Sequence, residues 1–364
     1  MNFPRGRAII FFLARKRLSQ PLILAAAFLF LFFPRFSVGP VPFIDFFAKY
    51  AKQWPNAALK PESEYIRDSG LGQFVFRLLP VDGIYWFGLI HLTALLCGLS
   101  LIFLTLRREL QDDYVYPVFR IIILGQIGYV LFRWVGSYDA FTFLLWGMFF
   151  FFASRKRFYL ALLSTIGLGF QHFEQASVGI LGLVLISIFL KKPTDFFEFK
   201  FLLKSFGAIT LGKILLLGAL VFNGHSISGR SNYFTIQFLE LGLSEVTNNL
   251  PLFLWSLFGA FWIVVINFLL KTSGKRQLIP LILYFAFCLT IAIFARDHSR
   301  VFVLTTFPAL LYISLHYLKN HGDANRYIGR IEILTWVTVP VALWENNLLG
   351  SFNLFGEIFA QLTK

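Results

Sequence analysis

The sequence contains little cysteine and little charge. Its only two cysteines, Cys97 and Cys288, lie inside apolar stretches with no histidine or second cysteine at ligand spacing. The sequence therefore predicts neither a disulfide framework nor a structural zinc site. Charged residues make up 14% of the chain against 57% hydrophobic residues, which is more apolar surface than one soluble core can bury.

The apolar stretches recur along the whole chain, and short charged clusters separate them. This pattern is typical of a transmembrane helical bundle. We predict an all-α, polytopic fold of about 11 spans in a single integral membrane domain over residues 1–364. The predicted spans are residues 21–34, 82–105, 114–133, 139–153, 158–171, 176–190, 205–222, 250–270, 277–294, 301–317 and 331–346.

Four parts of this domain are distinguished. Residues 1–20 look like a secretory signal, but Arg15 to Arg17 follow the apolar Ile9 to Leu13 and no small-residue cleavage site comes next. A basic interfacial helix is therefore expected there. A first non-cytosolic loop with amphipathic helices is expected over 36–81, the remaining helical bundle over 82–346 and an amphipathic tail over 347–364.

The formal charge of +14 suggests nucleic-acid binding at first sight. Its distribution argues against nucleic acid as a partner, because alternate loops differ in charge. With the N-terminus in the cytosol, the cytosolic segments carry +13 and the outer segments −1, while Arg120 and Lys213 lie within spans where they can snorkel toward the cytosol. The excess charge thus orients the protein, and the membrane lipids are its predicted surroundings.

Residues 158–190 allow two topologies, a single long span or a tight pair broken at residues 171–175. A single span places the later basic clusters outside, whereas a pair keeps them in the cytosol. We therefore predict the pair. Each arm of about 14 residues reaches only about 21 Å, which leaves room for a cavity on the outer side.

The first outer loop contains the amphipathic pieces 43–54 and 63–79, separated by breakers at Pro55 and Pro61. Apolar residues at 43, 44, 46, 47, 50, 51 and 54 give the first piece a face suited to the membrane interface. Asp45 is a candidate catalytic carboxylate in that piece. Its alternative role is a solvated carboxylate in a first helical turn.

Two further outer segments contain candidate catalytic residues. Asp139 follows Gly136 at the entry to a span, and the alternative role is a helix N-cap. His172 and Glu174 lie at the apex of the short pair. Ionisable groups at membrane depth usually face a protein interior or a water-filled cavity, which favours a functional role for both.

The turn from Arg296 to Arg300 is the candidate phosphate-binding site. Arginine presents a planar fork of donors to phosphate oxygens and keeps its charge, so Arg296, Arg300 and His298 suit a polyprenyl phosphate headgroup. The alternative is that the arginines snorkel at headgroup level and pair with the neighbouring acid. Arg230 in the preceding outer loop is a further candidate, with a plain solvated arginine as its alternative.

Together these features resemble the GT-C class of membrane glycosyltransferases. The resemblance rests on Asp45 soon after the first span, the Gly136 to Asp139 entry followed by the basic turn Arg155 to Arg157, and the arginine-rich turn before the span that contains Pro308. It implies a donor sugar on a polyprenyl phosphate, a glycan or lipid acceptor, an outer-face carboxylate as general base and a bacterial plasma membrane. The first outer loop lacks the paired carboxylates that many members carry.

The chemistry fits these residue types. A carboxylate, Asp45 or Asp139, takes the proton of the attacking hydroxyl, and Arg296 with Arg300 holds the leaving phosphate. No cofactor is required by the spacing; a divalent cation on a second carboxylate is a possible addition, and the metal ligands stay unassigned.

Three other functions stay open on the sequence. A polysaccharide polymerase or ligase uses the same lipid-linked donors. A transporter or lipid flippase places ionisable groups near the membrane midplane and often has repeated halves, and no such repeat is found in the sequence. A purely structural membrane component predicts that every polar site named above is dispensable.

The predicted topology is testable by cysteine labelling. A version without Cys97 and Cys288 that carries Lys156→Cys should stay unlabelled by a membrane-impermeant reagent in intact cells, because position 156 is predicted to face the cytosol. Labelling of that cysteine from outside inverts the topology.

Overall fold

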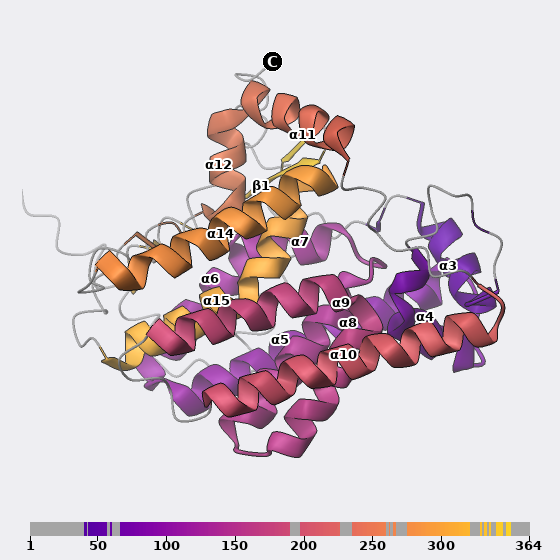
Figure 1. Ribbon diagram of the computed structural model, residues 1–364, viewed down its shortest axis with the longest axis horizontal. Helices are drawn as coiled ribbons and strands as arrows, with labels where there is room; N and C mark the ends of the chain where they lie inside the picture. The colour runs from indigo at the N-terminus through magenta and orange to yellow at the C-terminus, as the bar shows by residue number, and fades with distance from the viewer. Residues whose placement is uncertain are drawn as a thin grey trace, which may run out of the picture.

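The computed structural model describes residues 40–41, 43–56, 59, 66–189, 197–225, 235–259, 262, 265–266, 275–320, 328–329, 331–332, 335, 340–344 and 347–350. These residues are mostly helical, as predicted (Figure 1). The predicted interfacial helix at 1–20 and the predicted span at 21–34 lie outside the described residues. So do residues 351–364 of the predicted tail.

The long apolar helices of the bundle agree with the predicted spans to within several residues. They are α5 (Ile84–Glu109), α8 (Asp139–Ser154), α10 (Phe199–Phe222), α14 (Lys275–Ala295) and α15 (His298–Asn320). Four described helices are long and apolar enough to cross a membrane, namely α5, α9 (Phe158–Phe189), α10 and α15. Helix α9 meets this measure only when its two arms, which are interrupted at His172, are taken as one helix. A chain with several such helices is a membrane protein; the count of 11 stays a prediction.

The predicted span at 114–133 is bent. It is divided into α6 (Asp112–Leu124) and α7 (Gln126–Arg133), which meet at Gly125 with a bend of 46°. Pro117 lies inside α6, and Gly125 ends that helix because glycine weakens a helix interior. If the bent pair is counted as one span, it is the fifth candidate.

The predicted break in residues 158–190 is present. Helix α9 (Phe158–Phe189) is interrupted at His172, whose backbone is non-helical. The side chain of Gln171 donates to the carbonyl of Tyr138, so the break in α9 lies beside the start of α8. Both arms of α9 run from this point along α8. Gly167 in the first arm lies against Leu145 of α8, and Gly179 in the second arm lies against the next residue, Trp146. One arm is thus antiparallel and the other parallel to α8, so the chain folds back at His172.

The first outer loop forms α3 (Ile44–Gln53) and α4 (Gly70–Leu78), as the two amphipathic pieces predicted; residues 63–65 lie outside the described residues. The expected membrane-facing role of the first piece needs correction. Tyr50, Ala51 and Trp54 are buried, whereas Phe43 and Phe46 are exposed. The rings of Trp54 and Phe170 meet at 6.1 Å, so much of the apolar face of α3 packs on the bundle.

Two predicted spans in the C-terminal half differ from the structure, the first by an interruption at Gly259, beyond which residues 262, 265 and 266 are again helical. The predicted span at 250–270 begins as α12 (Leu250–Phe258), which is preceded by α11 (Ile236–Asn248), and α12 stops at Gly259 with a φ of 51°. Only glycine adopts that conformation freely. The predicted span at 331–346 is wrong in its last part, because residues 341–344 form the strand β1.

The strand β1 (Val341–Trp344) pairs antiparallel with β2 (Asn347–Gly350), from Val341 opposite Gly350 to Trp344 opposite Asn347. Pro340 directly precedes β1, and proline has no amide hydrogen with which to continue a helix. Figure 1 shows β1 beside α12 and the turn between α14 and α15.

Helices α9 and α10 approach through glycine. A Cβ on Gly212 of α10 would lie 2.0 Å from the carbonyl oxygen of Ile166, and a Cβ on Gly169 of α9 would lie 1.9 Å from that of Ile209. Small residues allow such close backbone contact between helices in membranes. The first arm of α9 is therefore held against α10 over the turns that lead to the break.

We predict that Gly212→Ala lowers the stability of the protein by about 2 kcal/mol, because the added methyl group forces two helix backbones apart. Thermal unfolding in detergent micelles measures the effect. The matched control is Gly207→Ala on the same helix, where a Cβ meets nothing within 4 Å. That variant should be neutral or slightly stabilising, and an equal loss in both variants contradicts the packing described here.

Candidate functional site

The predicted site residue Asp139 is buried at the start of α8, where it meets Arg300 from the first turn of α15. The Nη1 atom of Arg300 lies 3.0 Å from Oδ2 of Asp139, and the hydroxyl of Ser137 donates to the same oxygen at 2.9 Å. Asp139 is 4% exposed. Tyr138 is the N-cap residue of α8 and no side chain caps it, so Asp139 does not have the N-cap role considered from the sequence.

Arg300 also contacts a second carboxylate, Asp297, which lies three residues earlier in the turn between α14 and α15. Burial raises the pKa of Asp297, and the charge of Asp139 raises it further, while Arg300 acts against both. A guanidinium thus lies between two carboxylates that come from different parts of the chain. In a site shielded from water, these charges interact more strongly than they would on an exposed surface.

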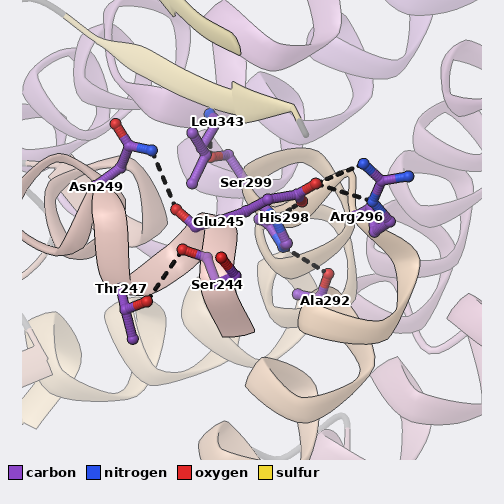
Figure 2. A network of polar contacts seen from close by, with 9 residues as sticks. All are labelled: Ser244, Glu245, Thr247, Asn249, Ala292, Arg296, His298, Ser299 and Leu343. Atoms are coloured by element: carbon purple, nitrogen blue, oxygen red, sulfur yellow. Dashed lines mark hydrogen bonds and ion pairs between the residues drawn. The ribbon is translucent and has the colours of Figure 1, made fainter. Parts of the chain in front are cut away.

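A second network involves the other half of the same turn (Figure 2). The carboxylate of Glu245 on α11 accepts from Nε of Arg296 at 3.0 Å through one oxygen, and its other oxygen lies 3.0 Å from Nε2 of His298. Glu245 is 1% exposed and His298 is fully buried. Figure 2 shows the Glu245 side chain reaching from α11 to these two partners.

The surroundings of His298 define its protons. Its Nδ1 atom lies 3.1 Å from the carbonyl oxygen of Ala292, and its Nε2 atom faces the carboxylate of Glu245. A carbonyl oxygen only accepts, so Nδ1 carries a hydrogen. The Nε2 atom and the carboxylate of Glu245 lie within hydrogen-bond distance, and this contact couples α11 to the start of α15.

Arg296 has a left-handed backbone, with a φ of 54°. Residues other than glycine pay about 1 to 3 kcal/mol for sparsely populated conformations and hold them where the surroundings require it. The ion pair with Glu245 supplies such a requirement. This strained turn carries three of the four residues that the sequence identified as phosphate-binding candidates, namely Arg296, His298 and Arg300.

The break in α9 carries a third group of charges. Glu174 lies 3.6 Å from Nδ1 of His172 and 3.5 Å from Nζ of Lys213, and the same lysine nitrogen lies 3.3 Å from Asp68. The predicted pair His172 and Glu174 is therefore brought together. The prediction that Lys213 snorkels toward the cytosol is wrong, because the first outer loop supplies Asp68 as its partner.

Gln171 connects this group with the Asp139 site. Its side-chain oxygen accepts from the amide of Gly72 at 2.9 Å, and its side-chain nitrogen donates to the carbonyl of Tyr138 at 3.0 Å. Gln171 is fully buried. One amide side chain thus ties α4, the apex of α9 and the start of α8 together at one end of the bundle.

One described sequence candidate, Asp45, does not join these networks. Asp45 is exposed in the first turn of α3, and among the described residues it has no hydrogen bond or ion pair. That placement matches the solvated carboxylate considered as its alternative role. Arg230 lies outside the described residues.

The networks contain charged residues that the sequence did not identify as site residues, namely Asp68, Lys213, Glu245 and Asp297. Asp297 was visible as an acid inside an arginine-rich turn. Glu245 had no such signal, because α11 has a polar and weakly periodic sequence and its partner is 51 residues away. Only the fold brings those two residues together.

The arrangement provides carboxylates beside guanidinium groups. Arg296 and Arg300 both have carboxylate partners, so an incoming anion would compete with Glu245, Asp139 and Asp297 for their donors. The part of the chain that the structure describes contains no group of three or more histidine, cysteine, aspartate or glutamate residues placed to hold a metal ion. The expected site for a divalent cation therefore receives no assigned ligands.

Comparison with known proteins finds no family model, no curated protein and no solved structure that matches this chain. The function is consequently inferred from the geometry of the networks alone.

We predict that Glu245→Gln lowers stability by on the order of 3 kcal/mol, because Arg296 loses its buried counter-charge. The loss should appear as a lower thermal midpoint and as faster proteolysis of α11. Glu240→Gln is the matched control, since Glu240 lies on the same helix and is exposed. If both variants behave like the unmodified protein, the Glu245 network does not hold α11 in place.

Proposed function

We propose that the chain is a membrane glycosyltransferase that moves a sugar from a polyprenyl-phosphate-linked donor to a glycan or lipid acceptor on the non-cytosolic face. The observation that supports this most is the position of Arg300 between Asp139 and Asp297 in a shielded site. A bacterial plasma membrane is the proposed location, with the N-terminus in the cytosol.

The reaction needs a base and a cation. A carboxylate accepts the proton of the acceptor hydroxyl while that oxygen forms a bond to the anomeric carbon of the sugar. The bond between the anomeric carbon and the phosphate oxygen breaks, and its electron pair leaves with the phosphate. A guanidinium stabilises the charge that develops on the phosphate.

Asp139 and Asp297 are the proposed base candidates of this site. Burial raises the pKa of Asp297, which makes this carboxylate a stronger proton acceptor than an exposed aspartate. Arg300 contacts both acids and is the proposed group for the leaving phosphate, with Arg296 four residues earlier in the same turn. His298 positions Glu245, which holds Arg296 in place.

A polysaccharide polymerase or ligase would use the same groups, since its donors carry the same phosphate. The acceptor separates these activities: a polymerase or ligase product is a longer chain or a chain joined to a new carrier, whereas a transferase adds one sugar.

A transporter or lipid flippase is the second candidate, and one observation favours it. Helix α9 is discontinuous, and its break holds His172 and Glu174 beside Lys213 of α10. Transporters use discontinuous helices with ionisable groups at the break. In this case the lysine and the glutamate are required for substrate movement without chemical change.

The proposed transferase is tested in proteoliposomes with a panel of polyprenyl-phosphate-linked hexoses and pentoses. Asp139→Asn and Arg300→Gln should each lower sugar transfer by roughly a hundredfold or more, because each removes a group from the reacting atoms. Asp297→Asn, Glu174→Gln and Arg296→Gln belong in the same series, and Asp45→Asn tests the first-loop carboxylate.

Asp82→Asn is the matched control, since Asp82 is an exposed carboxylate just before α5. Transfer should be unchanged in this variant. Full activity in the Asp139 and Arg300 variants rules out the proposed site. Unaltered lipid that crosses the bilayer in a Lys213-dependent manner favours the transporter instead.

A further inference from the structure

The turn between α8 and α9 gathers basic side chains at the end of the bundle opposite the candidate site. The amide of Arg157 donates to the carbonyl of Phe152 at 2.9 Å, and that of Lys156 donates to Ala153 at 2.9 Å. This pair of bonds is a Schellman motif, and Lys156 takes its left-handed position with a φ of 57°. The turn therefore holds Arg155 and Arg157 in fixed places.

Arg108 from the last turn of α5 joins this cluster. Its Nε atom donates to the carbonyl of Ser154 at 2.8 Å, which places it beside Arg155. Burial lowers the pKa of Arg155, and the charges of Arg108 and Arg157 lower it further, while Glu109 acts in the opposite direction. Like charges are thus crowded at this turn.

One nearby acid, Glu109, balances only part of that crowding. One oxygen of its carboxylate forms an ion pair with Lys319, and the other lies 3.9 Å from Nε of Arg108. Among the described residues, Arg155 and Arg157 have no carboxylate within ion-pair distance. The contrast with the candidate site is clear, since Arg296 and Arg300 there both have acidic partners.

Most donors of the cluster face no acceptor among the residues that the structure describes. Arg155 donates through Nη1 to the carbonyl of Phe151 at 3.2 Å, and its guanidinium lies 3.6 Å from the centre of the Phe151 ring. A guanidinium has five N–H donors, so one hydrogen bond leaves several for an anion. Phosphate oxygens match that planar fork.

The surface next to the cluster is apolar. Tyr159, Leu160 and Leu163 begin the first arm of α9, and they are 90%, 39% and 60% exposed. Their spacing places them along one side of the helix. An exposed aromatic ring at the end of a span with aliphatic side chains behind it is the arrangement that membrane interfaces favour.

We propose that Arg108, Arg155 and Arg157 bind the phosphate of an anionic phospholipid, whose acyl chains lie along Tyr159, Leu160 and Leu163. The charge of the cluster selects an anion, and the apolar strip selects a lipid over a soluble phosphate ester. The proposed site is more specific than the general attraction between cytosolic basic loops and acidic membranes, because it places one lipid headgroup at the turn between α8 and α9.

The test uses the full-length protein in nanodiscs of phosphatidylcholine with a titrated fraction of phosphatidylglycerol, and native mass spectrometry measures the phosphatidylglycerol bound. The variant Arg155→Gln with Arg157→Gln should weaken that binding roughly thirtyfold, the loss expected for two basic groups at an anionic surface. Arg157→Gln alone, at an exposed position, should weaken it roughly fivefold and serves if the double variant does not fold.

The matched control is Lys200→Gln with Lys204→Gln. These exposed lysines lie at the start of α10 on the same end of the bundle, where Phe158 and Phe201 are in contact. This variant should retain far more phosphatidylglycerol binding than the double arginine variant, because both lysines lie outside the proposed site. An equal loss in both double variants, or no loss in either, overturns the assigned site. If glycerol phosphate displaces bound phosphatidylglycerol as effectively as an equal concentration of the lipid, the ligand is a soluble phosphate ester and the proposed lipid specificity is wrong.

Discussion

The pairing of buried charges determines how the described helices fit together. A charged side chain shielded from water is costly unless an opposite charge neutralises it. The Asp139 and Arg300 pair meets this constraint between the first turn of α8 and the first turn of α15. Because this pair holds the first turns of both helices side by side, α8 and α15 run parallel. One to two turns further along, the ring centres of Phe143 and Phe307 are 5.1 Å apart. The ion pair thus sets the relative height of two central helices.

The same constraint explains the apex of α9. Gln171 satisfies the amide of Gly72 and the carbonyl of Tyr138, and the folded-back chain at His172 brings Glu174 to Lys213 and Asp68. Each contact joins the predicted first outer loop, the start of α8 or α10 to the break. A polar apex at this depth is stable because three separate parts of the chain supply its partners.

Much of the helical fold could be predicted because apolar runs and basic turns carry that information locally. The break at residues 171–175 was predicted from charge, since only a folded-back pair keeps the later basic clusters on one side. The strand at 341–344 was missed because Val341 to Trp344 is as apolar as a span, and hydropathy does not distinguish an apolar strand from an apolar helix. Pro340 was the local signal for that boundary.

The site was predicted in part for a related reason. Asp139, His172, Glu174 and the arginine-rich turn were visible because charge is unusual beside apolar runs. Glu245 could not be identified in this way, because it lies in a predicted loop, where charged residues are common. Its role depends on Arg296, which is 51 residues away in the sequence. A single sequence indicates where charges are costly, but it does not state which charges neutralise one another.

The partners of the arginines determine what each end of the bundle is able to bind. At the candidate site, Arg300 already has two carboxylates, so a phosphate gains its place only by displacing one of them. A displaced carboxylate in a shielded site is a stronger proton acceptor than one held by a guanidinium. Donor binding and base activation would then be the same event, because the phosphate that occupies the arginine releases the acid. At the opposite end no carboxylate lies within ion-pair distance of Arg155 or Arg157 among the described residues, and the proposed anion there would displace no acidic partner of these two arginines. Pairing thus suits the first end to a transient, reacting phosphate and its absence suits the second to a resident one.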